Sequence, residues 1–264
     1  NPNYEDRTGE ATVKITKAPV TITVNDASKV YGTSDPAFTG TVVGLKGSDS
    51  IGTVSYNRVG SDENVGTYPD VLTASYTDNP NYEVTVNKGD FTITKATSET
   101  LTVTGYEGVY DGAAHTITVG GTVAGDTVWY STDGGATWSE TNPEYTNVGE
   151  YPVKVKVTNP NYEDRTGEAT VKITKAVVVV KADSDTRVYN GEEQTVTGYQ
   201  TPVGLLTDHV LSGISANGSG TNVGNYPVTF TGTPVIKDGD VDVTENYDVT
   251  LVPGNLEITP APLI

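Results

Sequence analysis

The chain has 264 residues and a formal net charge of −18, from 34 acidic and 16 basic side chains. This charge argues against nucleic acid or an anionic membrane as a partner, because phosphate binding needs clustered lysine and arginine. Cysteine and methionine are both absent, which excludes disulfides, thiolate metal sites and a cysteine nucleophile. The longest apolar run, residues 176–180, is too short to insert into a membrane.

Internal repeats divide the chain. The segment NPNYEDRTGEATVKITKA fills residues 1–18 and returns unchanged at 159–176, and diverged copies lie at 79–96 and 245–261. We therefore predict the terminal strand or strands of a preceding repeat at 1–17 and the start of a following repeat, or a tail, at 262–264. Between them we predict three β domains, at 18–96, 97–176 and 177–261. The segment 1–17 is expected to pair with a sheet edge, in this chain or in a neighbouring one.

Strands are predicted where apolar and polar residues alternate with a period of two. In chain order the clearest runs are VTITV at 20–24, DFTITKA at 90–96, LTVTG at 101–105, EYPVKVKVT at 150–158, ATVKITK at 169–175 and VVVVK at 177–181. The stretch VWYSTDGGATWS at 128–139 predicts a hairpin with its turn at 133–135. Short strands with frequent turns indicate an all-β chain of small Ig-like β-sandwich domains in tandem, forming an elongated rod. A β-grasp arrangement of each unit is the alternative.

One phrase, Asn-Val-Gly-x-Tyr-Pro, occurs at 64–69, 147–152 and 222–227. Ig-like domains place a tyrosine after a tight turn at the start of a strand, and its hydroxyl bonds back to the backbone. Tyr68, Tyr151 and Tyr226 are the candidates for such a structural corner. The glycine of the phrase is expected to supply a backbone conformation that side chains disfavour.

Two short signatures carry a family resemblance. Ala18-Pro19-Val20-Thr21-Ile22, Val30-Tyr31-Gly32 and Thr92-Ile93-Thr94-Lys95 resemble MBG-type (YGX) repeats, and Val109-Tyr110-Asp111-Gly112 resembles YDG-type repeats. The resemblance implies the Ig-like repeat region of a large bacterial cell-surface protein of the adhesin kind, and hence an extracellular location on the bacterial surface. It supplies no catalytic residues.

Few residues are arranged for chemistry. His115 and His209 lie in different domains, in neither metal-ligand nor triad spacing, so we expect no enzyme, no catalytic residue and no bound cofactor. Asp238, Asp240 and Asp242 alternate along one segment, which would place their carboxylates on one side of an extended chain. They could gather oxygen ligands for calcium, or they could form an exposed acidic loop.

Aromatic residues gather on the predicted hairpin of the middle domain. Trp129, Tyr130 and Trp138 are the candidate ligand-binding residues, because outward-facing aromatic rings stack on sugars or anchor in a partner protein. At least one of the three is expected to fill the core.

The sequence therefore predicts a repeat region that presents a binding surface to host glycoproteins such as mucin and that contacts its neighbouring repeats. Three alternatives stay open. The region could be a structural spacer or stalk, a module that binds a host protein such as an immunoglobulin, or a filament subunit joined by strand donation.

Overall fold

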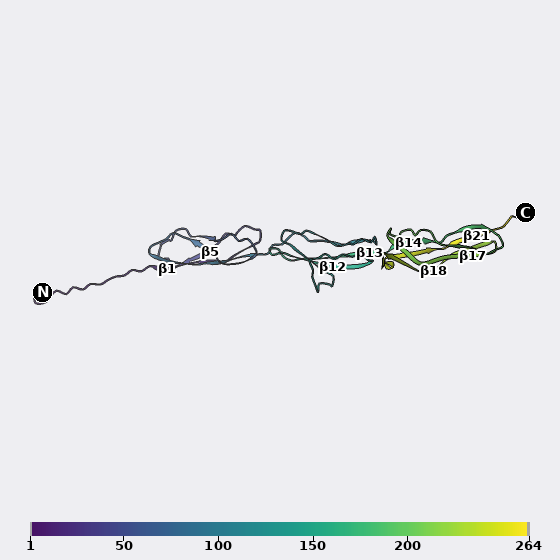
Figure 1. Cartoon of the computed structure of the whole chain (residues 1–264). Helices are drawn as coiled ribbons and strands as arrows, with labels where there is room; N and C mark the ends of the chain where they lie inside the picture. The colour runs from purple at the N-terminus through teal and green to yellow at the C-terminus, as the bar shows by residue number, and fades with distance from the viewer. Residues whose placement is uncertain (1, 263–264) are drawn as a thin grey trace. The chain divides into compact units, whose positions relative to one another are not determined.

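The computed structural model describes residues 2–262, and its strands fall into three groups that follow the predicted repeats (Figure 1). We call residues 18–96, 97–176 and 177–261 repeats 1, 2 and 3. The first group contains β1 (Ala18–Val24), β2 (Ala27–Val30), β3 (Gly40–Val43), β4 (Ser55–Arg58), β5 (Gly66–Ser75), β6 (Tyr82–Asn87) and β7 (Gly89–Thr94). The second contains β8 (Thr102–Thr104), β9 (Tyr106–Val109), β10 (Thr118–Gly120), β11 (Thr127–Ser131), β12 (Gly149–Thr158) and β13 (Arg165–Thr174).

The third group contains the longest strands. Its elements are β14 (Ala176–Lys181), β15 (Asp185–Val188), β16 (Gln194–Thr197), β17 (His209–Gly220), β18 (Gly224–Asp238), β19 (Val241–Asp242), the 3-10 helix η1 (Thr244–Asn246), β20 (Tyr247–Val252) and β21 (Gly254–Thr259). β17 and β18 lie side by side in Figure 1 and pair antiparallel. Outside η1, the part of the chain that the structure describes contains no helix, and none of it could cross a membrane as a helix.

Each group is built of two sheets. In repeats 1 and 3 the strands from the start and the end of the repeat run parallel and pass together from one sheet to the other. In repeat 1, β1 pairs with β6 in the sheet β3-β1-β6, and β2 pairs with β7 in the sheet β2-β7-β5-β4. In repeat 3, β14 pairs with β20 and β15 with β21 in the same way. The crossing brings two backbones close together: a Cβ on Gly89 would lie 2.9 Å from the carbonyl oxygens of Val24 and Asn25. Glycine is therefore required at this point.

By contact density the chain forms two compact units. Unit 1 comprises residues 1–99, 123–126 and 158–164, and unit 2 comprises residues 100–122, 127–157 and 165–264. In unit 1, Val20, Ile22, Leu72, Phe91 and Ile93 are buried in the core. Unit 1 thus includes the segments of repeat 2 that pack on the end of repeat 1.

In unit 2 the core follows the period-two pattern of the sequence. Val153, Val155 and Val157 of β12 are buried, and they pack in one cluster with Val171 and Ile173 of β13. The same cluster continues through Tyr110 and Tyr247 to Val178 and Val180 of repeat 3. The alternation seen in the sequence therefore reports which face of each strand is buried.

The N-terminal segment does not form the expected strand. Residues 5–17 contain no strand, and Val13 and Ile15 are 87% and 91% exposed. Their counterparts in the identical segment of repeat 2, Val171 and Ile173, are 0% and 2% exposed, because β13 lies between β12 and β9. A strand needs such neighbours for stability. The expected pairing within this chain is therefore wrong, and pairing with a neighbouring chain stays a prediction.

Candidate functional site

The predicted hairpin of repeat 2 is present and ends in a hydrogen-bonded loop. Tyr130 and Ser139 exchange two main-chain hydrogen bonds, of 2.7 and 2.9 Å. Inside the loop, the Asp133 carboxylate accepts bonds from the hydroxyl groups of Ser131 and Thr137 and from two main-chain N–H groups. The bonds from Thr137 are the largest cause that holds the pKa of Asp133 well below its ordinary value. The loop is therefore fixed by a charged acceptor at its centre.

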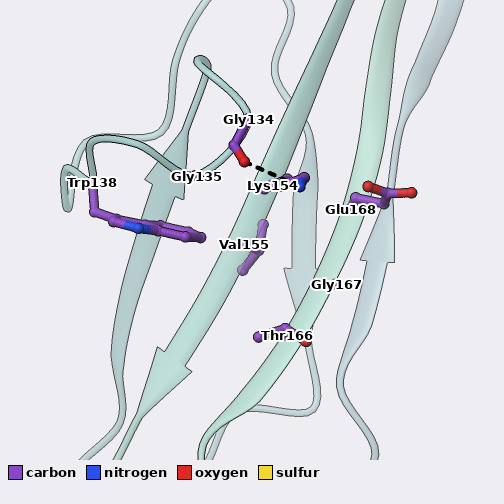
Figure 2. Close-up of a pocket in the computed structure, with 8 residues that line it drawn as sticks. All are labelled: Gly134, Gly135, Trp138, Lys154, Val155, Thr166, Gly167 and Glu168. Atoms are coloured by element: carbon purple, nitrogen blue, oxygen red, sulfur yellow. Dashed lines mark hydrogen bonds between the residues drawn. The ribbon is translucent and has the colours of Figure 1, made fainter.

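A hollow of about 400 Å³ lies between this loop and the exposed face of β12 and β13. Figure 2 shows the Trp138 indole pointing toward the strand that carries Lys154 and Val155, with Glu168 on the neighbouring strand. Lys154 donates a hydrogen bond of 3.1 Å to the carbonyl oxygen of Gly134, and Lys154 and Glu168 are directly paired in the sheet register. The Lys156 ammonium lies 4.6 Å from the centre of the Trp138 ring, within range of a cation–π contact. The hollow thus combines an aromatic face with charges of both signs.

The three aromatic residues predicted to bind a ligand lie in different places. Trp138 lines the hollow and is half-buried. Tyr130 packs against the core, and burial raises the pKa of its hydroxyl. Trp129, between the core-facing Val128 and Tyr130, alternates to the other side of β11 and is half-buried. Only Trp138 of the three lines this hollow.

The three corner tyrosines make the same bond. The hydroxyl groups of Tyr68, Tyr151 and Tyr226 donate to the carbonyl oxygens of Asn64, Asn147 and Asn222, at 2.7, 3.1 and 2.9 Å. Each bond spans four residues and closes the turn before a long strand. This is the geometry expected of a tyrosine corner.

In repeats 1 and 2 the reason for the corner glycine differs from the one expected, whereas Gly224 of repeat 3 has a positive φ of 155°. Gly66 and Gly149 are not among the residues with positive φ, so the expected unusual backbone conformation is wrong at both. In repeat 2 a Cβ on Gly149 would lie 2.7 Å from the Tyr151 ring. The glycine there makes room for the tyrosine that turns back over it.

The asparagine and the valine of each phrase also form one side of a contact between repeats. Together with the tyrosine of the earlier Val-Tyr turn, we call these residues the socket. The first junction, within unit 1, joins the socket Tyr31, Asn64 and Val65 to Asn161 and Tyr162 of repeat 2. The Val65 N–H donates to Asn161 Oδ1 at 2.9 Å, and Asn161 Nδ2 donates to Asn64 Oδ1 at 3.1 Å. The rings of Tyr31 and Tyr162 meet edge to face, with centres 5.4 Å apart.

The second junction, within unit 2, repeats these contacts with different residues. The socket is Tyr110, Asn147 and Val148, and the incoming pair is Asn246 and Tyr247 of repeat 3. The Val148 N–H donates to Asn246 Oδ1 at 2.8 Å, and Asn246 Nδ2 donates to Asn147 Oδ1 at 3.0 Å. Tyr110 and Tyr247 also meet edge to face at 5.4 Å.

An ion pair accompanies each junction, Lys95 with Asp164 at 3.5 Å and Lys175 with Glu245 at 3.9 Å. Sequence reasoning did not find the asparagines Asn161 and Asn246. The signal that could have found them is the dipeptide Asn-Tyr, which recurs at 81–82, 161–162 and 246–247. Its tyrosine begins β6 in repeat 1 and β20 in repeat 3, and in repeat 2 it lies just before β13.

The acidic segment of repeat 3 forms a turn. Asp242 accepts bonds from the main-chain N–H and the hydroxyl of Thr244, and Asp238 lies 3.8 Å from the buried His209. Over residues 2–262 the structure contains no cluster of three histidine or acidic side chains that could hold a metal ion. Calcium binding by Asp238, Asp240 and Asp242 stays a prediction.

Comparison with solved structures gives remote similarities. The chain is similar to the N-terminal eight Ig domains of Down syndrome cell adhesion molecule isoform 1.30.30, with 14% identity over 92% of this chain and a TM-score of 0.21. It is also similar to the human desmocollin-1 ectodomain, with 9% identity over 91% of this chain and a TM-score of 0.22. The chain spans 40% and 60% of the length of these two structures. No curated protein matches it.

Two family matches follow the repeats. The MBG domain of the YGX type matches residues 20–92, and a further MBG domain matches residues 99–177. Neither description names a catalytic activity. Together the matches cover repeats 1 and 2 and agree with the Val-Tyr turns and closing Ile-Thr-Lys-Ala segments of the sequence. The chain therefore belongs to the MBG-domain family, as a tandem of all-β repeats.

Proposed function

We propose that this chain is a non-enzymatic repeat region of an extracellular surface protein, and that its first task is to couple successive repeats into a spacer. The observation that carries the proposal is the repetition of one contact set at both junctions. Two hydrogen bonds, one edge-to-face tyrosine pair and one ion pair recur with different residues in each place. Flexible linkers do not repeat such contacts.

The contacts suit a spacer because each is directional. An asparagine side chain offers one acceptor and two donors, and at each junction it uses both kinds toward one Asn-Val step. A simple apolar contact would allow neighbouring repeats to rotate against each other. The paired bonds and the tyrosine edge define one orientation at each junction.

The test of this proposal is residue-specific ¹⁵N relaxation on the full chain. Coupled repeats are expected to share one anisotropic tumbling time. The double variant Asn161→Ala with Asn246→Ala should shorten the local correlation times of repeats 1 and 3. Repeats that already tumble independently in the unmodified chain would contradict the proposal.

A second task is supported by the hollow beside Trp138, which we propose presents a binding surface to glycoproteins such as host mucins. The Trp138 indole that lines the hollow offers a stacking surface for a sugar ring, and Lys154 and Glu168 supply a donor and an acceptor beside it. The sialylated chains of mucins are anionic, and Lys154 lines the hollow while the Lys156 ammonium lies over the Trp138 ring. This surface favours a glycan over an immunoglobulin, because the hollow is small compared with a protein interface.

Binding to immobilised mucin, before and after removal of sialic acid, tests this second task. Trp138→Ala should abolish saturable binding, and Trp129→Phe, the matched control, should leave it unchanged. Binding that survives Trp138→Ala would place the adhesive surface elsewhere. Binding to polyclonal immunoglobulin would favour the host-protein alternative, and concentration-dependent polymerisation would favour the filament.

A further inference from the structure

Repeat 3 carries the same socket that repeats 1 and 2 use at their junctions. We propose that Tyr189, Asn222 and Val223 form a third docking site, whose occupant is the Asn-Tyr pair of another MBG-type repeat. The inference rests on the proposed function, because it takes the two occupied junctions as coupling contacts. It extends that function by naming a surface and the chemistry that fits it.

The third socket has the same internal bonds as the occupied ones. The Tyr189 N–H donates to the carbonyl oxygen of Thr259 at 2.9 Å, as Tyr31 does to Thr94 and Tyr110 to Thr174. The threonine side chain returns a bond of 3.2 Å to the strand before the tyrosine in all three repeats. The backbone of the socket is therefore in place before any partner arrives.

The position of Asn222 is fixed by the corner. The hydroxyl of Tyr226 donates to the carbonyl oxygen of Asn222 at 2.9 Å, as Tyr68 and Tyr151 do to Asn64 and Asn147. The corner tyrosine thus positions the asparagine-valine step that receives the next repeat. This gives the recurring Asn-Val-Gly-x-Tyr-Pro phrase a second role, in docking.

The tyrosine and the valine of the third socket are exposed, whereas those of the other two sockets are buried or half-buried. Tyr189 is 40% exposed, whereas Tyr110 of the second junction is 4% exposed. Val223 is 51% exposed, and its counterparts Val65 and Val148 are half-buried. An exposed tyrosine next to an exposed valine is an apolar surface that a partner can cover.

The occupant follows from what fills the other sockets. Asn161 and Asn246 each accept from a valine N–H and donate to an asparagine side chain, and Tyr162 and Tyr247 each place a ring against the socket tyrosine. The Asn-Pro-Asn-Tyr turn supports this geometry, because the Asn161 N–H is held by Asn159 Oδ1 at 2.9 Å. An Asn-Tyr pair on a folded MBG-type repeat therefore fits Val223 and Tyr189.

One contact will differ. Lys95 and Lys175 precede the alanines of the occupied junctions and pair with acidic residues of the next repeat. Pro260 takes their place before Ala261. The third junction is therefore expected to lack the ion pair and to depend less on salt concentration than the other two.

The test extends the full chain after Ala261 with a second copy of residues 97–176 and follows amide hydrogen exchange at Val223. In the extended chain, exchange at Val223 should slow by roughly five- to thirty-fold, the range that one or two hydrogen-bond equivalents produce. Asn161→Ala, introduced in the appended copy alone, should restore fast exchange. The amides of Val65 and Val148 serve as internal references for occupied sockets.

Each outcome decides one point. Slowing at Val223 that the appended Asn161→Ala reverses supports the third socket. Unchanged exchange at Val223, with Val65 and Val148 protected, overturns the third socket and leaves the proposed function intact. Slowing that persists in the appended Asn161→Ala variant also overturns it, because the asparagine is then not the acceptor. Unprotected Val65 and Val148 in the original chain would instead contradict the proposed function.

Discussion

Removing the asparagine of the second junction should destabilise unit 2. Asn246 is 4% exposed, and its side chain accepts from the Val148 N–H at 2.8 Å and donates to Asn147 Oδ1 at 3.0 Å. The change Asn246→Ala removes both bonds and leaves the half-buried Val148 N–H without this acceptor. A lost bond costs about 1 kcal/mol net, and a buried donor left unpaired costs about 1–3 kcal/mol. We expect a loss of about 2–3 kcal/mol in the free energy of unfolding.

Urea unfolding followed by tryptophan fluorescence measures this loss, because Trp129 and Trp138 both lie in unit 2 with Asn246. The midpoint should fall while the slope with urea stays constant. Asn217→Ala is the matched control, because Asn217 lies in the same unit as the two tryptophans and its side chain is exposed. That control should change stability by less than about 0.5 kcal/mol. Equal effects of the two substitutions would show that the Asn246 bonds do not stabilise unit 2.

Three further predictions concern the corner and the hairpin loop. Tyr151→Phe removes the hydroxyl bond to Asn147 and should cost about 1 kcal/mol of unfolding free energy in urea; an unchanged midpoint would contradict this. Gly149→Ala should lower the free energy of unfolding by about 1–3 kcal/mol, because the added methyl group overpacks against the Tyr151 ring. The loss should be larger than for Gly66→Ala, because the added Cβ lies 2.7 Å from the ring in repeat 2 but 3.9 Å from the tyrosine in repeat 1. Equal shifts in the melting temperature would show that this steric contact is not the cause. Because its pKa is lowered in the folded state, the ionised Asp133 carboxylate stabilises the fold at any pH above the ordinary carboxyl pKa. This stabilisation is lost as the pH falls through the folded-state pKa. The stability difference between the unmodified chain and Asp133→Asn should therefore be constant near neutrality and shrink below about pH 4, and a pH-independent difference would show that the charge is not involved.

Local patterns predicted the strands well and their partners poorly. The alternation in residues 150–158 and 169–175 matches β12 and β13, because every second side chain of a strand points to the same face, and one face is buried. The same letters in residues 7–16 form no strand, because the neighbours of β13 come from elsewhere in repeat 2. The parallel pairing of first and last strands is likewise a long-range property. Gly89 in repeat 1 and Gly254 in repeat 3, where two backbones approach, mark it locally.

The candidate sites divide in the same way. The corner bonds of Tyr68, Tyr151 and Tyr226 span four residues, so a short repeated phrase was sufficient to predict them. The junction asparagines contact a different repeat, and no local pattern reports such a contact. The three aromatic residues of the hairpin can be identified in the sequence, but the face of the strand to which the Trp129 and Tyr130 side chains point depends on the strand register. Register is set by the whole sheet.

The central claim is that one contact set couples the repeats at both junctions. A double-mutant cycle between Tyr31 and Tyr162, using leucine at each position, measures the first junction most directly, because the two rings meet edge to face across it. We expect a coupling free energy of about 0.5–1.5 kcal/mol, the range for aromatic pairs. The two substitutions would instead be additive, with a coupling near zero, if the repeats did not hold each other in solution.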